Sequence, residues 1–256
     1  MDEANGAQSE VLARAGSCKA MIGLVDRPRE AMTYAAEHPR SWWVGALLAL
    51  ASLAILAVVS APLNAQMAAE QVQARLALVE VPEEQMQQLS RFVREPSETS
   101  LILSGVGMGL VGLCLSWVLR ATVLHFSAQV LGGESEFLPM FSVAVWSGFP
   151  SVLRNLAQAA FVLMAGQLVT NPGLSGLVAT GDTLADSMNV VWVLLSSLDL
   201  FLLWHLILSA TGLAVVSGLS RAKSGVVVLI WWAVSRGIAL IPVLVGRGLM
   251  SGLGGA

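Results

Sequence analysis

Residues 196–213 read Ser-Ser-Leu-Asp-Leu-Phe-Leu-Leu-Trp-His-Leu-Ile-Leu-Ser-Ala-Thr-Gly-Leu and lie within an apolar run from Asn189 to Val216. A run of this length can cross a bilayer as a helix. It nevertheless carries Asp199 near its middle and His205 further on. An ionisable side chain that faces lipid costs at least about 2.5 to 3.5 kcal/mol. The sequence therefore predicts that Asp199 faces other helices, with Arg154 and Arg236 as its partners.

The composition is that of a membrane protein. Hydrophobic residues make up 55% of the 256 residues and charged residues only 12%, whereas soluble domains carry about 25% charged residues. The mean hydropathy is +0.72. We therefore expect an all-α polytopic protein without room for a separate soluble catalytic domain of the usual size. The net charge of -3 argues against nucleic acid as a partner.

Five apolar segments predict five transmembrane helices in one bundle, approximately at 42–62, 100–124, 140–168, 189–216 and 225–245. Pro150 predicts a kink in the third span. The expected organisation is a disordered cytoplasmic tail (1–20), an interfacial amphipathic helix (21–40), the five-span membrane domain (41–246) with an external helical loop at 63–99, and a short external tail (247–256). Within 21–40, Asp26 is expected to cap and Pro28 to open a short helix that runs to about Glu37 and stops at His38-Pro39.

An odd number of spans places the two termini on opposite sides of the membrane. Lysine and arginine are enriched on the cytoplasmic side. Eight of them precede the first span or fall in loops on that side, against four on the other: Arg14, Lys19, Arg27, Arg29, Arg40, Arg120, Arg221 and Lys223 against Arg75, Arg91, Arg94 and Arg247. The counts predict a cytoplasmic N-terminus and an external C-terminus.

Arg154, Asp199 and Arg236 each lie about ten to fifteen residues from the ends of their predicted spans, which places all three near the bilayer midplane. With Gln158 and His205 they form a predicted intramembrane polar cluster. The cluster admits two interpretations, a structural ion pair that fixes helix register and a proton or ion relay. Arginine does not deprotonate, so two arginines and one carboxylate favour the structural interpretation. His205 is likewise expected to be a hydrogen-bonded helix contact.

Gly105, Gly109 and Gly112 in the second span predict close helix packing. Residues 107–112, Gly-Met-Gly-Leu-Val-Gly, match the dinucleotide-binding fingerprint letter by letter. The match has no preceding strand and no acidic residue at the expected distance, so helix packing is the better interpretation. No cofactor is predicted.

Catalytic and metal sites are not predicted. Residues 173–176, Gly-Leu-Ser-Gly, resemble the nucleophile motif of rhomboid proteases, but Ser175 falls in an external loop and His205 near the cytoplasmic side. A gap of roughly 20 Å forbids proton transfer between them. The three histidines, His38, His125 and His205, are scattered without metal-ligand spacing.

Three segments resemble the Yip-domain family of Ypt/Rab-interacting membrane proteins, in its bacterial branch. Leu198 to Trp204, continued by Gly212-Leu213 and by Ser217 to Lys223, is similar to the family's C-terminal signature. Pro28 to Met32 with His38-Pro39 resembles its N-terminal proline motif, and Leu131 to Phe137 followed by Pro150 resembles its central loop and third span. The likeness covers residues 21–245.

The resemblance implies a five-span helical bundle with a cytoplasmic N-terminus. Eukaryotic members are scaffolds for Rab GTPases, but their Asp-Leu-Tyr-Gly-Pro motif is absent here, so Rab binding is not carried over. Bacterial members resemble accessory proteins, some associated with ABC-type efflux permeases. We therefore expect a non-enzymatic adaptor of the bacterial inner membrane that binds another membrane protein or a second copy of itself. The alternative is a small permease or ion pathway that uses Asp199, Arg154 and Arg236.

Overall fold

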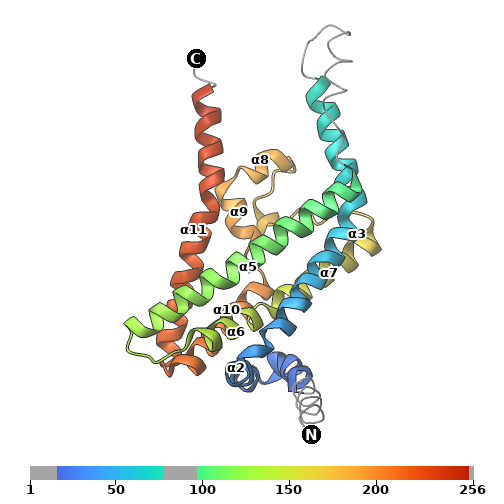
Figure 1. The fold of residues 1–256 in the computed structure, drawn as a ribbon. Coiled ribbons are helices and arrows are strands. Elements are labelled where there is room, and N and C mark those ends of the chain that lie inside the picture. The colour runs from blue at the N-terminus through green and yellow to red at the C-terminus, as the bar shows by residue number, and fades with distance from the viewer. Residues whose placement is uncertain (1–15, 78–96, 254–256) are drawn as a thin grey trace. The chain divides into compact units, whose positions relative to one another are not determined.

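The computed structural model describes residues 16–77 and 97–253, and this part of the chain is almost entirely helical and contains no β-strand (Figure 1). Residues 16–26 form a first helix, which begins inside the segment expected to be a disordered tail. The elements that follow are α2 (Pro28–Glu37), η1 (Pro39–Ser41), α3 (Trp42–Ala77), α5 (Glu98–Val130), α6 (Phe137–Trp146), α7 (Phe149–Ala165), η2 (Ser175–Leu177), α8 (Thr183–Ser187), α9 (Val190–Ser196), α10 (Leu200–Ser217) and α11 (Arg221–Leu253). The prediction of an all-α fold is confirmed.

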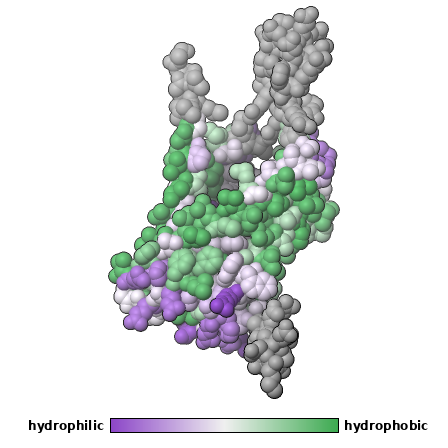
Figure 2. All heavy atoms as spheres, viewed as in Figure 1, coloured by the Kyte–Doolittle hydropathy of each residue, from purple (hydrophilic) through white to green (hydrophobic). Residues whose placement is uncertain are grey.

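Within the described residues, 4 helices are long and apolar enough to cross a membrane: Pro39–Glu70, Glu98–Val130, Leu200–Ser217 and Arg221–Gly246. Figure 2 shows hydrophobic residues over the long helices and hydrophilic residues gathered where Figure 1 places α2 and the α5–α6 connection. Apolar side chains exposed on this scale need lipid around them. The chain is therefore a multi-pass integral membrane protein.

The first span begins at Trp42 as predicted and continues as one helix through Pro62 to Ala77. The sequence expected the span to end near Pro62, followed by a helical loop outside the bilayer. Residues 63–77 form a helical extension of α3, which is one of the two forms expected of that loop beside a helical hairpin, and residues 78–96 of the loop lie outside the described part of the chain.

The third predicted span is two helices. α6 ends at Trp146, and α7 begins at Phe149 with Pro150 as its second residue. Proline suits the first turn of a helix because its missing N–H needs no partner there. At the break, the Ser147 hydroxyl donates to the Ala144 carbonyl oxygen at 3.0 Å. The expected kink at Pro150 is thus a complete break two residues earlier, and the prediction of one continuous helix is wrong.

The fourth predicted span is also broken, between α9 and α10. Asp199 has an extended backbone and caps α10, its side chain accepting from the Leu202 N–H at 2.7 Å. The hydroxyls of Ser196 and Ser197 each donate to the carbonyl oxygen three residues earlier at 2.8 Å. Serine and aspartate compete with helical backbone hydrogen bonds in this way. The prediction of a single helix over 189–216 is therefore wrong, although most residues around these three are apolar.

Arg120 corrects the charge count. The sequence placed it in a cytoplasmic loop, but it lies inside α5, which continues for a further ten residues to Val130. Its guanidinium contacts the main chain of α6 instead of water. The side predicted to be cytoplasmic loses one charge from the count, because Arg120 lies within the helix and within the span predicted at 100–124.

The chain forms two compact units, and each is described by itself. Unit 1 comprises the described residues of Met1–Ala49, Cys114–Val152 and Thr170–Ala256, and unit 2 comprises those of Leu50–Leu113 and Leu153–Val169. In unit 1, α2 packs against α6 and α10, and α10 packs against α11 (Figure 1). Its core contains the fully buried side chains of Met32, Trp146 and Leu208.

α2 begins and ends as the sequence predicts, at Pro28 and before His38-Pro39. Asp26 does not cap it, because the N-cap residue is Arg27 and makes no side-chain cap. The face that contains Ala31, Met32 and Ala35 is buried in the core with α6 and α10. The apolar face that predicted an interfacial helix therefore packs, at least at these three residues, on protein.

In unit 2, the three helix segments are parts of α3, α5 and α7. The Asn155 side-chain N–H donates to the Ser52 hydroxyl oxygen at 3.2 Å and so joins α7 to α3. α5 approaches α3 closely at Gly109, where an added Cβ would overlap the Leu53 side chain. The helix-packing role of Gly109 stays a prediction, and this close approach is the observation that supports it.

Candidate functional site

The central-loop and C-terminal motifs are adjacent in unit 1, although about eighty residues separate them in sequence. The Glu134 N–H donates to the Ser217 carbonyl oxygen at 3.2 Å. A Cβ on Gly133 would lie 2.7 Å from that oxygen, so glycine is needed for the approach. Gly218 ends α10 in the left-handed conformation at φ 69°, which turns the chain into α11.

The N-terminal motif joins the same part of unit 1 through α2. Met32 is fully buried, and an added Cβ on Gly212 of α10 would lie 3.1 Å from its Sδ. The same Cβ would overlap the Val143 side chain of α6. In addition, the Trp204 indole N–H donates to the Leu24 carbonyl oxygen at 3.2 Å, tying helix 16–26 to α10. The three motifs thus mark places where elements of unit 1 approach one another closely.

His205 ties α10 to the break between α6 and α7. Its Nδ1 lies 2.6 Å from the Ser147 carbonyl oxygen. A carbonyl oxygen only accepts, so Nδ1 carries the hydrogen in this arrangement. On the other side of the ring, Nε2 lies 3.5 Å from the Ser209 hydroxyl, one turn along α10. The break in the third span leaves the Ser147 carbonyl without a helical partner, and His205 supplies it.

Arg120 binds the same turn from α5. Its guanidinium donates to the Ala144 carbonyl oxygen at 3.3 Å and to the Ser116 hydroxyl at 3.4 Å. Its Nε is buried without a hydrogen-bond partner among the described residues. Arg120 and His205 therefore hold the α6–α7 break from two different helices.

Arg236 of α11 brings a third basic group to this region. Its charge acts on both Arg120 and His205, so the three side chains lie within electrostatic range of one another. The Nε of Arg236 is also buried and has no hydrogen-bond partner in the described part of the chain. Arg120 and Arg236 are two positive charges in an apolar surrounding, and an anionic group nearby would stabilise them.

The predicted polar cluster is distributed over both units. His205, Asp199 and Arg236 belong to unit 1, with Asp199 at the start of α10. Arg154 and Gln158 lie on α7 in unit 2. Both Arg154 and Asp199 are engaged in polar or electrostatic interactions. Their mutual pairing stays a prediction.

The three glycines predicted for helix packing differ in their surroundings. Gly109 contacts Leu53, whereas a Cβ on Gly105 or Gly112 would meet no atom within 4 Å. α5 buries only its C-terminal residues Trp117, Ala121, Leu124 and Ala128. Close helix packing at Gly105 and Gly112 thus stays a prediction, and its partner would have to lie outside the described residues.

Sequence reasoning missed Arg120 and the Ser147 carbonyl. The span predicted at 100–124 already contained Arg120, which was the signal that its side chain lies among the helices. The Ser147 carbonyl could not be found, because only the break in the third span releases it. A main-chain acceptor has no sequence signature of its own.

The contacts at the α6–α7 break hold helices together, and Ser175 and His205 each bind other groups. The Ser175 hydroxyl donates to the Pro172 carbonyl oxygen at 2.7 Å, and the ring nitrogens of His205 contact Ser147 and Ser209. His125 lies in α5, where it contacts Ser135 and Gln129. Across residues 16–77 and 97–253, no group of three or more metal-binding side chains is present.

A family model described as Yip1 domain matches residues 22–243. No curated protein and no solved structure matches the chain. The matched region takes in all three motifs, the break at Ser147 and the basic side chains around it. The chain therefore belongs to the Yip1 domain family of multi-pass membrane proteins.

Proposed function

We propose that this protein is a non-enzymatic membrane adaptor, which binds another integral membrane protein or a second copy of itself. The observation that carries the proposal is the use made of the polar side chains in the membrane helices. His205 and Arg120 bind main-chain carbonyls at the α6–α7 break, so they position helices. The family match supports a membrane role for the whole region.

The partner in this proposal is another membrane protein, such as an ABC-type efflux permease, in a bacterial inner membrane. Support comes from α5, whose N-terminal half exposes large apolar side chains, including Leu103, Met108 and Val111. Gly105 and Gly112 on the same helix have open space beside them. Small residues let another helix approach closely in a bilayer.

The topology proposed for the adaptor has five spans. α6 and α7 together make the fifth crossing beside the four continuous helices, with a cytoplasmic N-terminus and an external C-terminus. The basic residues that flank the first span support this orientation. The proposed domain map is a cytoplasmic tail (1–20), an interfacial segment (21–40), the membrane domain (41–246) with an external loop within 63–99, and an external tail (247–256).

The test is purification of the full chain in mild detergent after crosslinking in membranes. The adaptor function predicts one stoichiometric membrane-protein partner, or a homo-oligomer. Gly105→Leu and Gly112→Leu should reduce the yield of the crosslinked complex, because the larger side chains obstruct a close helix contact.

Gly132→Ala, in the α5–α6 connection, is not suitable as a control because its φ of 81° strains any other residue. Gly225→Ala is the matched control, because its Cβ also meets open space but lies on α11. Recovery of monomer alone would contradict the proposal.

Asp199 is proposed to neutralise the basic side chains as a structural ion pair with Arg154 and Arg236. Asp199→Asn separates this role from helix capping, since asparagine caps a helix as well as aspartate does. The clamp predicts that Asp199→Asn lowers the free energy of unfolding by several kcal/mol, about 3 to 5, because an arginine among the membrane helices loses its counter-charge. Asp199→Ala should lose about a further 1 kcal/mol with the cap.

The alternative function is a small permease or ion pathway. The breaks at Ser147 and at Asp199 favour it, because many transporters build their binding sites from interrupted helices. Proteoliposomes that contain Asp199→Asn distinguish the two functions. If the protein is an ion pathway, Asp199→Asn abolishes ion flux and leaves the melting temperature unchanged. If Asp199 is a structural clamp, Asp199→Asn lowers the melting temperature, and neither the wild type nor the variant shows flux.

A further inference from the structure

A groove lies between α2, α10 and the start of α11 in unit 1. Its volume is about 820 Å³, and α2 contributes Pro28, Arg29 and Thr33 to its lining. α10 contributes one face that contains Ile207, Ala210, Ala214 and Val215, and the turn into α11 closes the end with Ser220 and Arg221. Ala210, Ala214 and Gly218 follow one another at every fourth residue, and their small size explains the hollow.

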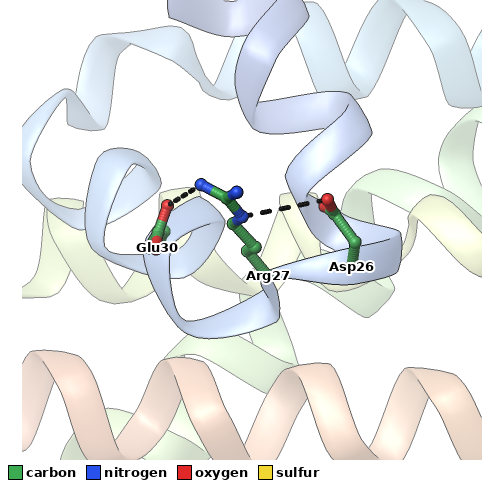
Figure 3. A network of polar contacts seen from close by, with 3 residues as sticks. All are labelled: Asp26, Arg27 and Glu30. Atoms are coloured by element: carbon green, nitrogen blue, oxygen red, sulfur yellow. Dashed lines mark ion pairs between the residues drawn. The ribbon is translucent and has the colours of Figure 1, made fainter.

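The rim of the groove is positively charged. Arg29 and Arg221 come from different helices, are both exposed and form no ion pair with a carboxylate of the described residues. The lining contains no aspartate or glutamate. The neighbouring Arg27 differs, because Asp26 and Glu30 lie 3.9 and 3.6 Å from its guanidinium nitrogens (Figure 3). Two unneutralised arginines at one rim are complementary to an anion with several oxygen acceptors.

The wall below the rim is apolar. Thr211 and Thr33 line the groove, but the Thr211 hydroxyl donates to the Ile207 carbonyl oxygen at 2.8 Å and the Thr33 hydroxyl to the Arg29 carbonyl oxygen at 2.9 Å. Both hydroxyl hydrogens are therefore used within their own helices. The face from Ile207 to Val215 extends about 12 Å along α10 at 1.5 Å per residue. A free phosphate ion would leave this length of apolar wall uncovered.

The position along α10 fits the boundary between headgroups and acyl chains. α10 spans Leu200–Ser217 and is long and apolar enough to cross a membrane. Arg221 follows its end after a turn of three residues, so the charged rim lies where the apolar helix stops. The ligand that matches the groove has an anionic head at one end and a hydrocarbon chain at the other.

We propose that this groove binds an anionic phospholipid, with the headgroup phosphate at Arg29 and Arg221 and the acyl chain along Ile207, Ala210 and Ala214. The bound lipid fills the space between α2 and α10 and connects α2 to the cytoplasmic leaflet. This inference is independent of the adaptor function, since lipid binding is measured on the purified chain without a protein partner.

The test is native mass spectrometry of the full chain in detergent, titrated with phosphatidylglycerol or with phosphatidylcholine. We expect phosphatidylglycerol to bind more tightly. Arg29→Gln and Arg221→Gln should each weaken its binding about fivefold, and the double variant about twentyfold, because each basic side chain contributes separately to anionic lipid binding. Arg27→Gln is the matched control and should leave binding unchanged, because Arg27 is outside the groove lining and already paired.

Ala214→Phe tests the apolar wall without changing charge. The larger ring fills the groove and should reduce phosphatidylglycerol binding about tenfold, close to the effect of one or two buried methylene groups of the lipid. A melting curve checks that each variant is folded. Equal binding of the two lipids, unchanged binding in the double arginine variant, or displacement of the lipid by millimolar inorganic phosphate would overturn the proposal. Ala214→Phe that folds and binds normally would overturn the acyl-chain position.

Discussion

Gly212 is the residue at which three elements of unit 1 come closest together. The Val143 side chain of α6 and the Met32 side chain of α2 occupy the space where a Cβ would be. Glycine in a helix interior costs about 1 kcal/mol relative to alanine. Here that cost is offset by the close approach of α10 to α6 and α2, so Gly212 stabilises the fold through packing although it weakens the helix.

Gly212→Ala is therefore expected to destabilise the protein, although alanine is the better helix former. The added methyl group must displace Val143 or Met32, which should lower the free energy of unfolding by about 1 to 3 kcal/mol. Thermal unfolding in detergent measures the change. Gly225→Ala on α11 is the control, because its Cβ meets no atom within 4 Å, and it should raise stability by up to about 1 kcal/mol. Equal melting temperatures for Gly212→Ala and wild type would refute the packing role.

Asp186 holds the loop before α8 through its carboxylate. It accepts from the Thr180 N–H and hydroxyl, each at 2.8 Å, and from the Gly181 N–H at 3.3 Å. These hydrogen bonds, above all the one from the Thr180 N–H, hold the pKa of Asp186 below its ordinary value, although burial opposes them. Hydrogen bonds to the charged form favour it in this way.

The depressed pKa predicts an acid-sensitive loop. A carboxyl whose pKa is lower in the folded state contributes its full stability above its unfolded-state pKa, about 4. That stability is lost as the pH falls through the lower folded-state pKa. We expect hydrogen-exchange protection of the Thr180 and Gly181 amides to fall below pH 4 in the wild type. Asp186→Asn should show low protection at every pH, and a variant that retains the wild-type pH profile would exclude Asp186 as the cause.

At the scale of elements, the breaks in the third and fourth spans are linked by a contact between α10 and the α6–α7 break. The break between α6 and α7 releases the Ser147 carbonyl, and α10 supplies His205 to it at 2.6 Å. The break before α10 in turn lets Asp199 cap α10, so that a new helix with its own axis direction begins there. A main-chain carbonyl without a partner costs several kcal/mol in lipid, so each break must be satisfied by a neighbouring element.

His205→Ala should consequently loosen the contact between α10 and the α6–α7 break. The Ser147 carbonyl loses its donor, and the free energy of unfolding should fall by about 1 to 3 kcal/mol. His205→Asn keeps a side-chain N–H donor and should recover part of the loss. Thr211→Val is the control, since the Thr211 hydroxyl binds only within α10. If His205→Asn melts at the temperature of His205→Ala, the hydrogen bond is not the stabilising interaction.

At the scale of the whole molecule, the arrangement of spans decides on which side of the membrane each terminus lies. The chain has 4 continuous candidate spans in its described part, and α6 with α7 makes the proposed fifth. An odd number of crossings places the termini on opposite sides, whereas an even number places them on the same side. The location of the two ends therefore tests the span count directly.

Cysteine accessibility measures this location. Cys18 and Cys114 are both free, and Cys18 is exposed near the N-terminal end. With Cys114→Ala as the background, a membrane-impermeant maleimide should leave Cys18 unlabelled in intact spheroplasts and label it after lysis. In a Cys18→Ala, Cys114→Ala background, Ala256→Cys should be labelled in intact spheroplasts. Protection of both thiols before lysis would mean an even number of crossings.

The sequence by itself determined that this chain is helical, that it crosses a membrane several times and that α2 runs from Pro28 to Glu37. These features follow from local properties, namely apolar length, proline positions and overall composition. Only the tertiary structure decided where the third and fourth spans break, and that Arg120 binds the Ala144 carbonyl. The physical reason is that a helix in lipid can be interrupted only where another element satisfies the released backbone groups. Those partners, His205 for Ser147 and Arg120 for Ala144, lie far away in sequence and become neighbours only through packing.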